Sequence, residues 1–379
     1  MLDFFKSFIG LKKFLSFKSD KKRIVFYSES HNYRKHFIEL IINLKKSSNY
    51  EISYVTSDAK DLDFIGGDLK PVYIGNGFIR TVFFTILKCD ILIMTLTNLG
   101  IHHLKKSKNC KNYVYIFHAI VSTHKCHEKE AFKNYDMIFT VAEFQKKELL
   151  EAEKIYKFPK KKIFTTGYFY FEHMLKNIKP NNTNPKNILF APTWIRSKKN
   201  LFEDYSVSII QLLLDYGYSV TLRTHPETFK RSKKTLKLIF QKFGDKKNFQ
   251  LNTNLDNIDC FDKSKLLITD DGGVGMEYAY LYKKPIIYIN YVKKIHNQFY
   301  KDLNIEPIED KFKRECGYEI DVSKIKSLEE KIIEVDSTFK DKMKNIKSFY
   351  EKNGLNNINS SKIATNIIIE NLNNKNDRN

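Results

Sequence analysis

Short apolar runs alternate with helically spaced apolar residues along most of the chain. Residues 23–27 form an apolar run that predicts a buried strand, the spacing of apolar side chains from Phe37 to Leu44 predicts a helix, and residues 50–56 predict a second strand. This strand–helix–strand order is typical of a parallel sheet. Further strands are expected at 72–74, 90–94, 113–117, 137–141 and 163–165. The pattern predicts a doubly wound α/β domain in the first half of the chain.

A stretch rich in asparagine and proline, residues 177–185, interrupts this pattern and has the composition of a linker. Beyond it, strands are expected at 187–190, 219–223, 266–269 and 285–289, with helices at 207–216 and 230–243. We therefore predict an N-terminal segment (1–21), two Rossmann-like domains (22–180 and 186–345), and a C-terminal helix and tail (346–379), with 371–379 disordered. Because parallel sheets bind ligands at the carboxyl ends of their strands, the expected fold class is α/β, with two doubly wound domains facing a cleft.

Length and composition support two folded domains. A chain of 379 residues exceeds what one hydrophobic core organises, and a hydrophobic content of 42% excludes an intrinsically disordered chain. The five cysteines are scattered without CxxC spacing, which excludes a disulfide framework or a zinc site and favours the reducing cytoplasm. No apolar run has the length needed to span a bilayer. We therefore expect a cytoplasmic protein.

The net charge of +21 narrows the set of partners. A basic protein suits an anionic partner such as a nucleotide, a phosphopolymer or a membrane surface, although a lysine-rich composition alone gives the same charge. The lysines are spread along the chain without an aromatic-interleaved basic module, so no nucleic-acid partner is expected.

Residues 1–17 mix phenylalanines with lysines. The lysines interrupt the apolar part and no small-residue cleavage site follows, so a signal peptide is not indicated. A helix here is amphipathic, with Lys12 inside the apolar arc. Two placements stay open: the helix lies on an anionic membrane surface, or it packs on its own domain.

The strongest local motif lies at residues 267–278, where an apolar strand runs into a glycine-rich turn that opens a helix. Gly272 and Gly273 let a phosphate approach the main chain at the positive end of that helix, although a plain tight turn has the same composition. Glu277, one turn into the helix, is placed to accept hydrogen bonds from ribose or glycerol hydroxyls. The adjacent Asp270 and Asp271 are compatible with Mg²⁺, but no metal or other cofactor is expected, because nearby cationic groups neutralise phosphate.

Two more segments place polar residues after strands of the second domain. Arg223 and His225 lie at the carboxyl end of the strand at 219–223 and are typical of a phosphate clamp, with the histidine adding charge when protonated. Thr193 and Trp194 follow the strand at 187–190. The threonine hydroxyl is a donor for phosphate, and the tryptophan forms either a wall of the donor site or part of the core.

His118 closes an apolar strand of the first domain. An imidazole, whose usual pKa is near neutral, is suited to take the proton of an attacking hydroxyl. The alternative is a core histidine satisfied by the backbone. Because His118 lies at the end of a strand, where parallel sheets bind ligands, it is the candidate general base.

These segments, together with residues 26–30, resemble the CDP-glycerol glycerophosphotransferase family, which comprises teichoic-acid primases and polymerases of GT-B shape and relatives in capsule loci. The resemblance covers roughly residues 22–300. It implies an acceptor domain at 22–180 and a nucleotide-donor domain at 186–345. By position it implies His118 as general base, Arg223 and His225 as pyrophosphate contacts with His225 also catalytic, and a donor turn of Asp271, Gly272, Gly273 and Glu277.

The chain departs from the family pattern in two places. Gly272 and Gly273 stand where the family usually has two serines, and Ala119 stands where a glycine usually follows the histidine. The Asp-Gly-Gly sequence is also similar to the turn of UDP-N-acetylglucosamine 2-epimerases, which share the GT-B shape.

The resemblance implies a transferase that moves glycerol phosphate, or a related alditol phosphate, from a CDP-linked donor to a hydroxyl of a surface-glycan or teichoic-acid-like acceptor. The acceptor hydroxyl attacks the β-phosphate and CMP leaves. The expected acceptor is lipid-linked or a glycan, and the expected location is the cytoplasm or the inner face of the cell membrane. The alternative is a GT-B glycosyltransferase or a 2-epimerase-like enzyme that uses a nucleotide sugar.

Overall fold

A computed structural model describes residues 2–63, 69–101, 104–178, 183–254 and 256–374. The chain divides into two compact units. Unit 1 comprises Met1–His118, Glu128–His173 and Leu355–Asn379, and unit 2 comprises Ala119–His127 and Met174–Gly354. Each unit therefore contains segments that are distant in the sequence. The predicted linker at 177–185 lies partly outside the described residues.

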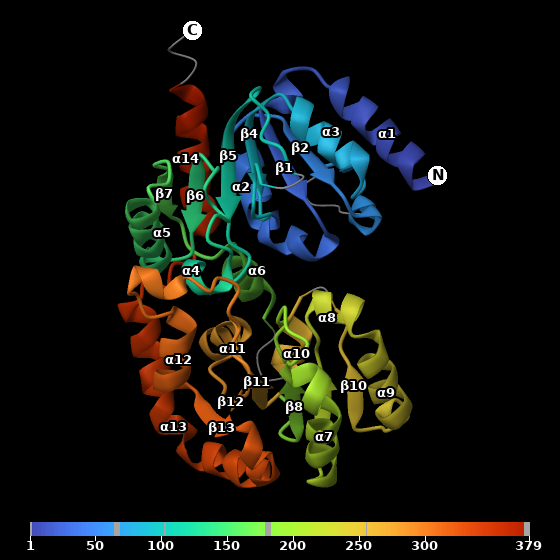
Figure 1. Ribbon diagram of the computed structural model, residues 1–379, viewed down its shortest axis with the longest axis vertical. Helices are drawn as coiled ribbons and strands as arrows, with labels where there is room; N and C mark the ends of the chain where they lie inside the picture. Colours follow the sequence, from blue (N-terminus) through green and yellow to red (C-terminus); the bar gives the residue numbers. More distant parts are fainter. Residues whose placement is uncertain (1, 64–68, 102–103, 179–182, 255, 375–379) are drawn as a thin grey trace. The chain divides into compact units, whose positions relative to one another are not determined.

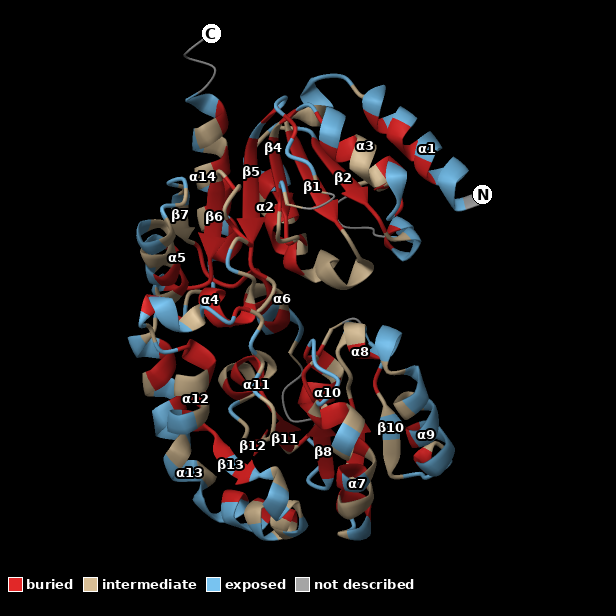
Figure 2. Cartoon of the chain, in the orientation of Figure 1, coloured by how far each residue is buried: buried red, intermediate tan, exposed pale blue. Residues whose placement is uncertain are grey.

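Unit 1 is built on a parallel sheet of seven strands in the order β3-β2-β1-β4-β5-β6-β7 (Figure 1). The strands are β1 (Ile24–Ser28), β2 (Ile52–Thr56), β3 (Val72–Tyr73), β4 (Cys89–Met94), β5 (Cys110–Ile116), β6 (Met137–Thr140) and β7 (Lys162–Thr165). The order reverses between β1 and β4, which is the doubly wound Rossmann arrangement. Its central strands are buried along their length because helices cover both faces (Figure 2).

The helices of unit 1 come from both ends of the chain. They are α1 (Leu2–Leu15), α2 (Ile38–Ser47), α3 (Phe78–Ile86), α5 (Glu143–Tyr156) and α14 (Ser360–Asn373), with α6 (Phe169–Asn177) starting in this unit and 3-10 turns η1 (Asp20–Lys22), η2 (His31–His36) and η3 (Ala59–Asp63). Helix α14 packs beside α2, and Ile368 and Leu372 join the core under the sheet. The expected disorder of 371–379 is therefore wrong for 371–373, because Leu372 is buried and Asn371 accepts a hydrogen bond from Asn112; residues 375–379 lie outside the described part.

The N-terminal helix α1 packs on its own unit. It contacts β3 and α3, and Phe14 meets the ring of Phe83 with the centroids 5.1 Å apart. Gly10 lies where a Cβ would come within 1.8 Å of the Tyr73 carbonyl oxygen, so only glycine permits this close approach. No helix among the described residues is long and apolar enough to cross a membrane.

Unit 2 repeats the same design with a parallel sheet of six strands in the order β10-β9-β8-β11-β12-β13. The strands are β8 (Asn187–Phe190), β9 (Ser219–Leu222), β10 (Phe249–Leu251), β11 (Leu266–Thr269), β12 (Ile286–Asn290) and β13 (Tyr318–Asp321). The helices are α4 (Thr123–Cys126), α7 (Leu201–Asp215), α8 (Pro226–Arg231), α9 (Lys233–Phe243), α10 (Ile258–Lys263), α11 (Val274–Tyr282), α12 (Ile308–Cys316) and α13 (Leu328–Lys352), with η4 (Tyr300–Leu303) and η5 (Val322–Ser327). Strand order reverses between β8 and β11.

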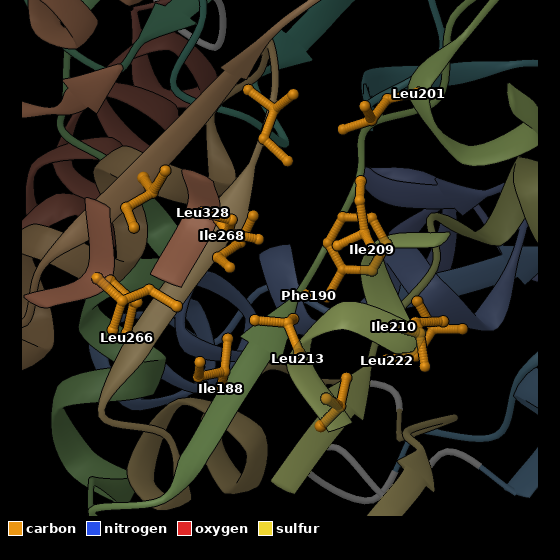
Figure 3. Packing of buried hydrophobic residues seen from close by; sticks show 14 of the residues in the cluster. Ile188, Phe190, Leu201, Ile209, Ile210, Leu213, Leu222, Leu266, Ile268 and Leu328 are labelled. Atoms are coloured by element: carbon orange, nitrogen blue, oxygen red, sulfur yellow. The ribbon is translucent and has the colours of Figure 1, made fainter. Parts of the chain in front are cut away.

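The core of unit 2 joins the sheet to α7, α9 and α13. Figure 3 shows Ile188 and Phe190 of β8 packed among Ile209 and Leu213 of α7. The helix expected at 230–243 is two helices, because Ser232 takes φ −100° and ψ 39°, outside the α-helical region, and separates α8 from α9. The expected two Rossmann-like doubly wound units are confirmed.

Candidate active site

The predicted threonine and the glycine turn meet where the strand order of unit 2 reverses. Thr193 follows β8 and Asp270 follows β11, and the Thr193 backbone N–H donates to Asp270 Oδ1 at 2.7 Å. The hydroxyl of Thr269 also donates to the carbonyl of Ala191 at 2.7 Å. In doubly wound sheets this reversal is the usual place for a ligand, since the connections leave it on opposite faces.

The two glycines of the turn are required by the protein's own packing. Gly272 has φ +155°, which side chains rarely adopt, and a Cβ on it would lie 3.0 Å from Thr193 Oγ1. A Cβ on Gly273 would lie 2.8 Å from the carbonyl oxygen of Ile120, so backbone occupies that direction. Helix α11 then begins at Val274 with Gly273 as its N-cap. At Gly273, the direction that a side chain would take is therefore occupied by another stretch of the chain.

Asp271 belongs to a buried ion cluster. Its Oδ2 lies 3.6 Å from Lys125 Nζ and accepts the Lys294 backbone N–H at 2.9 Å, while Oδ1 lies 3.5 Å from Lys313 Nζ. Burial acts to raise the pKa of this carboxyl, but Lys125 and Lys313 outweigh it, so the pKa is below its usual value. The carboxylate is therefore ionised and held by protein cations.

Asp270, the residue before Asp271 in the chain, has the opposite electrostatic environment. It is 2% exposed, and its Oδ2 has no hydrogen-bond partner among the described residues. Burial raises the pKa of Asp270 to about 7, against the hydrogen bond from Thr193 and with the help of the nearby Asp271 charge. Of these neighbouring carboxyl groups, Asp271 is therefore ionised at neutral pH, whereas Asp270 titrates close to it. No group of three or more histidine, cysteine or acidic residues suited to a metal occurs in the described part of the chain.

Arg223 and His225 are both held by loop contacts after β9. Arg223 Nη1 donates to Asn252 Oδ1 at 2.6 Å and to the Asn254 carbonyl at 2.8 Å. His225 caps helix α8: its Nδ1 accepts the Glu227 backbone N–H at 3.1 Å. This bond needs a lone pair on Nδ1, so in this arrangement the ring carries its proton on Nε2. His225 can donate one hydrogen bond from Nε2.

Trp194 links the loops that follow three strands of unit 2. Its ring stacks on His225 with centroids 6.2 Å apart, meets His296 edge-on at 5.9 Å, and lies under the Arg231 guanidinium at 5.8 Å. The ring is only partly buried. Of the two roles that the sequence left open, this packing favours a wall of the site over a place in the core.

Glu277 lies in the first turns of α11. Its Oε2 accepts a hydrogen bond from Asn257 Nδ2 at 3.0 Å, and the side chain is buried. Unit 2 thus brings Thr193 directly against the glycine turn, and it joins His225 to the neighbouring loop through Trp194.

His118 of unit 1 follows β5 and lies among aromatic side chains of the same unit. Its ring centroid is 5.0 Å from Tyr33 and 6.1 Å from His36, and its carbonyl accepts the Tyr168 hydroxyl at 3.0 Å. Burial, and then the charges of Lys35 and His118, hold the pKa of His36 well below its usual range, so this neighbour is neutral.

The sequence analysis did not single out His31, which lies on the 3-10 turn η2 together with His36. His31 Nδ1 lies 2.5 Å from Asp58 Oδ2, and the His31 backbone N–H donates to the same oxygen at 3.1 Å. The two residues follow β1 and β2, at the carboxyl edge of the sheet. The histidine-rich sequence after the first strand is the signal that could have pointed to it.

Two Rossmann-like sheets, one in each unit, define a protein of the GT-B fold class. Within that class, the chain belongs to the CDP-glycerol:poly(glycerophosphate) glycerophosphotransferase family, whose model matches residues 10–352. It is therefore a transferase of that family, which confirms the resemblance noted in the sequence. No curated protein sequence matches the chain significantly.

Solved structures with the same fold come from two kinds of enzyme. The wall teichoic acid polymerase TagF is 16% identical, with 98% of both chains covered and a TM-score of 0.63. MnaA of S. aureus in complex with UDP is 14% identical over 93% of this chain and 97% of that one, with a TM-score of 0.64. UDP-GlcNAc 2-epimerase from Neisseria meningitidis is 15% identical over 91% and 99%, with a TM-score of 0.61. At such identities the likeness concerns the fold.

Proposed function

We propose that the protein transfers glycerol phosphate, or a related alditol phosphate, from a CDP-linked donor to a hydroxyl of a surface-glycan or teichoic-acid-like acceptor. The observation that carries the proposal is the set of donors after β8 and β9, namely Thr193, Arg223 and His225, in a chain of this family. A TagF structure has been obtained with CDPG soaked in, which supports the choice of donor.

The residues of unit 2 act on the diphosphate. Other N–H groups of the Arg223 guanidinium donate to phosphate oxygens, and charge-assisted bonds of this kind are about twice as strong as neutral ones. Thr193 and the Nε2–H of His225 donate in the same way, and the His225 bond strengthens as negative charge develops on the leaving phosphate. Glu277 accepts from a hydroxyl of the ribose or of the glycerol.

His118 acts on the acceptor. It takes the proton of the acceptor hydroxyl as the hydroxyl oxygen bonds to the β-phosphorus. The bond from that phosphorus to the bridging oxygen breaks, and CMP leaves with its electron pair. The products are a phosphodiester, CMP and a proton held by the imidazole.

Nucleotide binding tests the donor. CDP-glycerol at a hundredfold excess over its Kd should stabilise the protein by about 2.7 kcal/mol, which thermal unfolding detects, and CMP should appear when an acceptor is added. Arg223→Gln should lose this shift, whereas Arg314→Gln, which alters an exposed ion pair with Glu306, should keep it. Stabilisation by UDP-N-acetylglucosamine or a CMP-sugar, with none by CDP-glycerol, would instead establish the nucleotide-sugar alternative that the epimerase-like fold keeps open.

We also propose that the acceptor is reached at an anionic membrane surface, through helix α1. While Ser7, Gly10, Leu11 and Phe14 face the unit, Phe4, Phe5, Phe8 and Ile9 are half or more exposed, together with Lys6, Lys12 and Lys13. Phe78, at the start of the neighbouring α3, is 70% exposed. Exposed apolar rings among lysines suit the boundary between acyl chains and anionic headgroups.

Vesicle flotation tests this surface. The wild type should float with vesicles containing phosphatidylglycerol and much less with phosphatidylcholine alone, since the lysines add attraction only to anionic lipid. Phe5→Ser combined with Phe8→Ser should lose flotation. Phe240→Ser serves as the control, because Phe240 is 64% exposed but lies on α9 of unit 2. Equal flotation of wild type and the double variant would contradict the proposal.

A further inference from the structure

Lys125 is a fully buried lysine outside the set of residues assigned above. Its side chain is 0% exposed, and its Nζ lies 2.7 Å from Asp310 Oδ1, 3.6 Å from Asp271 Oδ2 and 3.8 Å from Glu309 Oε1. Burial alone would lower the pKa of this amine, but the three carboxylates raise it above its usual value. A lysine is almost never buried without such partners, and here three acidic residues stabilise its one charge.

The residues around Lys125 are held as firmly as its side chain. Glu309 accepts the Ser122 backbone N–H at 2.9 Å and the Ser122 hydroxyl at 2.7 Å. The Lys125 carbonyl accepts the His296 backbone N–H at 2.9 Å, and Asn297 Nδ2 donates to the His124 carbonyl at 2.9 Å. Helix α12 and the loop after β12 therefore hold residues 122–126 through both side chains and backbone.

The segment that contains Lys125, residues 119–127, packs against the glycine turn. The Ile120 carbonyl occupies the direction of a Cβ on Gly273, and Asp271, one of the Lys125 partners, immediately precedes Gly272. The segment 119–127 belongs to unit 2, although it follows β5 of unit 1 in the sequence. His118, the proposed general base, is the residue directly before it.

We propose that Lys125 is a positioning residue for the transfer reaction: its ion pairs with Asp271, Glu309 and Asp310 fix segment 119–127 against the glycine turn, and thereby fix one end of the chain that carries His118. The inference rests on the proposed function. A base that is displaced by about 1 Å loses on the order of a hundredfold in rate. Loss of the Lys125 ion pairs should therefore lower the rate of transfer far more than the affinity for the donor.

The experiment compares Lys125→Met, Lys125→Arg and Lys161→Met. Lys161 is the matched control, because its side chain is 4% exposed and paired with Glu153 at 3.2 Å within unit 1. With CDP-glycerol as donor, Lys125→Met should lower kcat about a hundredfold while the donor-induced shift in Tm is kept. Lys125→Arg, which restores the charge, should recover kcat to within about tenfold of the wild type. Lys161→Met should lower Tm and leave kcat unchanged.

A second variant covers the case in which Lys125→Met does not fold. Asp310→Asn removes the closest partner of Lys125 at a carboxylate that is 24% exposed, and should lower kcat about tenfold at unchanged donor affinity. Wild-type kcat in either variant, or an equal loss of kcat in Lys161→Met, would overturn the inference alone. A wild-type protein that releases no CMP from CDP-glycerol would overturn the proposed function and this inference with it.

Discussion

Replacing His118 with alanine is expected to lower kcat by about a thousandfold and to leave the stabilisation by CDP-glycerol intact. General bases contribute roughly a hundred- to ten-thousandfold to such reactions, and the proposed base acts on the acceptor and not on the donor. The measurement is CMP release under donor saturation, together with the donor-induced shift in Tm. A parallel loss of turnover and of donor binding would contradict the role.

The matched control is another histidine of unit 1. His173→Ala removes a side chain that lies 3.6 Å from Glu39 and takes no part in the proposed mechanism, so kcat should stay within about twofold of the wild type. His31→Ala adds a second comparison. Asp58 orients the His31 ring, as an acidic residue orients the base in many hydrolases. If His31→Ala loses turnover while His118→Ala retains it, the role of general base belongs to the His31–Asp58 pair.

Asp270→Asn is expected to remove much of the pH dependence of stability between about pH 4 and pH 7. The carboxyl has a pKa of about 7 in the folded protein and 3.8 as its ordinary value. The folded state therefore keeps a proton that the unfolded state has lost, and stability falls as the pH rises through this window. Three pKa units correspond to on the order of 4 kcal/mol, so the asparagine variant should gain on the wild type as the pH rises.

Urea unfolding at pH 5 and pH 8 measures this difference. Asp245→Asn is the control, since Asp245 is exposed and its removal should leave the pH profile of the wild type. Asp271 does not confuse the result, because the pKa of its carboxyl is lowered and its contribution is lost only as the pH falls through more acidic values. Parallel profiles for the wild type and Asp270→Asn would show that Asp270 is ionised throughout.

Local sequence pattern was a good guide to the buried strands. Strands β8 and β11 have the predicted bounds, since a strand covered on both faces is a continuous apolar run. Strand β13 alternates between buried and exposed residues and follows helix α12 directly, and β10 is short and only partly buried, so neither has such a run. The break at Ser232 depends on one residue's backbone angles, which no apolar spacing records.

The sequence predicted the motifs of the site but not the residues, distant in the sequence, that contact them. Thr193 and the glycine turn could both be placed at the carboxyl edge of the second sheet, because each follows a predicted parallel strand. Lys125 could not be singled out, because a lysine in a basic chain carries no local signal and its closest carboxylate lies 185 positions further on. The same holds for Gly273, whose neighbour Ile120 comes from a distant segment and explains why a larger residue is not accommodated there.

The return of helix α14 to the first unit has a consequence for biosynthesis. Unit 2 is complete once residue 354 has been translated, but the sheet of unit 1 has part of its apolar face uncovered until Ile368 and Leu372 leave the ribosome. The segment made first is therefore finished last. During translation, that uncovered apolar face is open to aggregation.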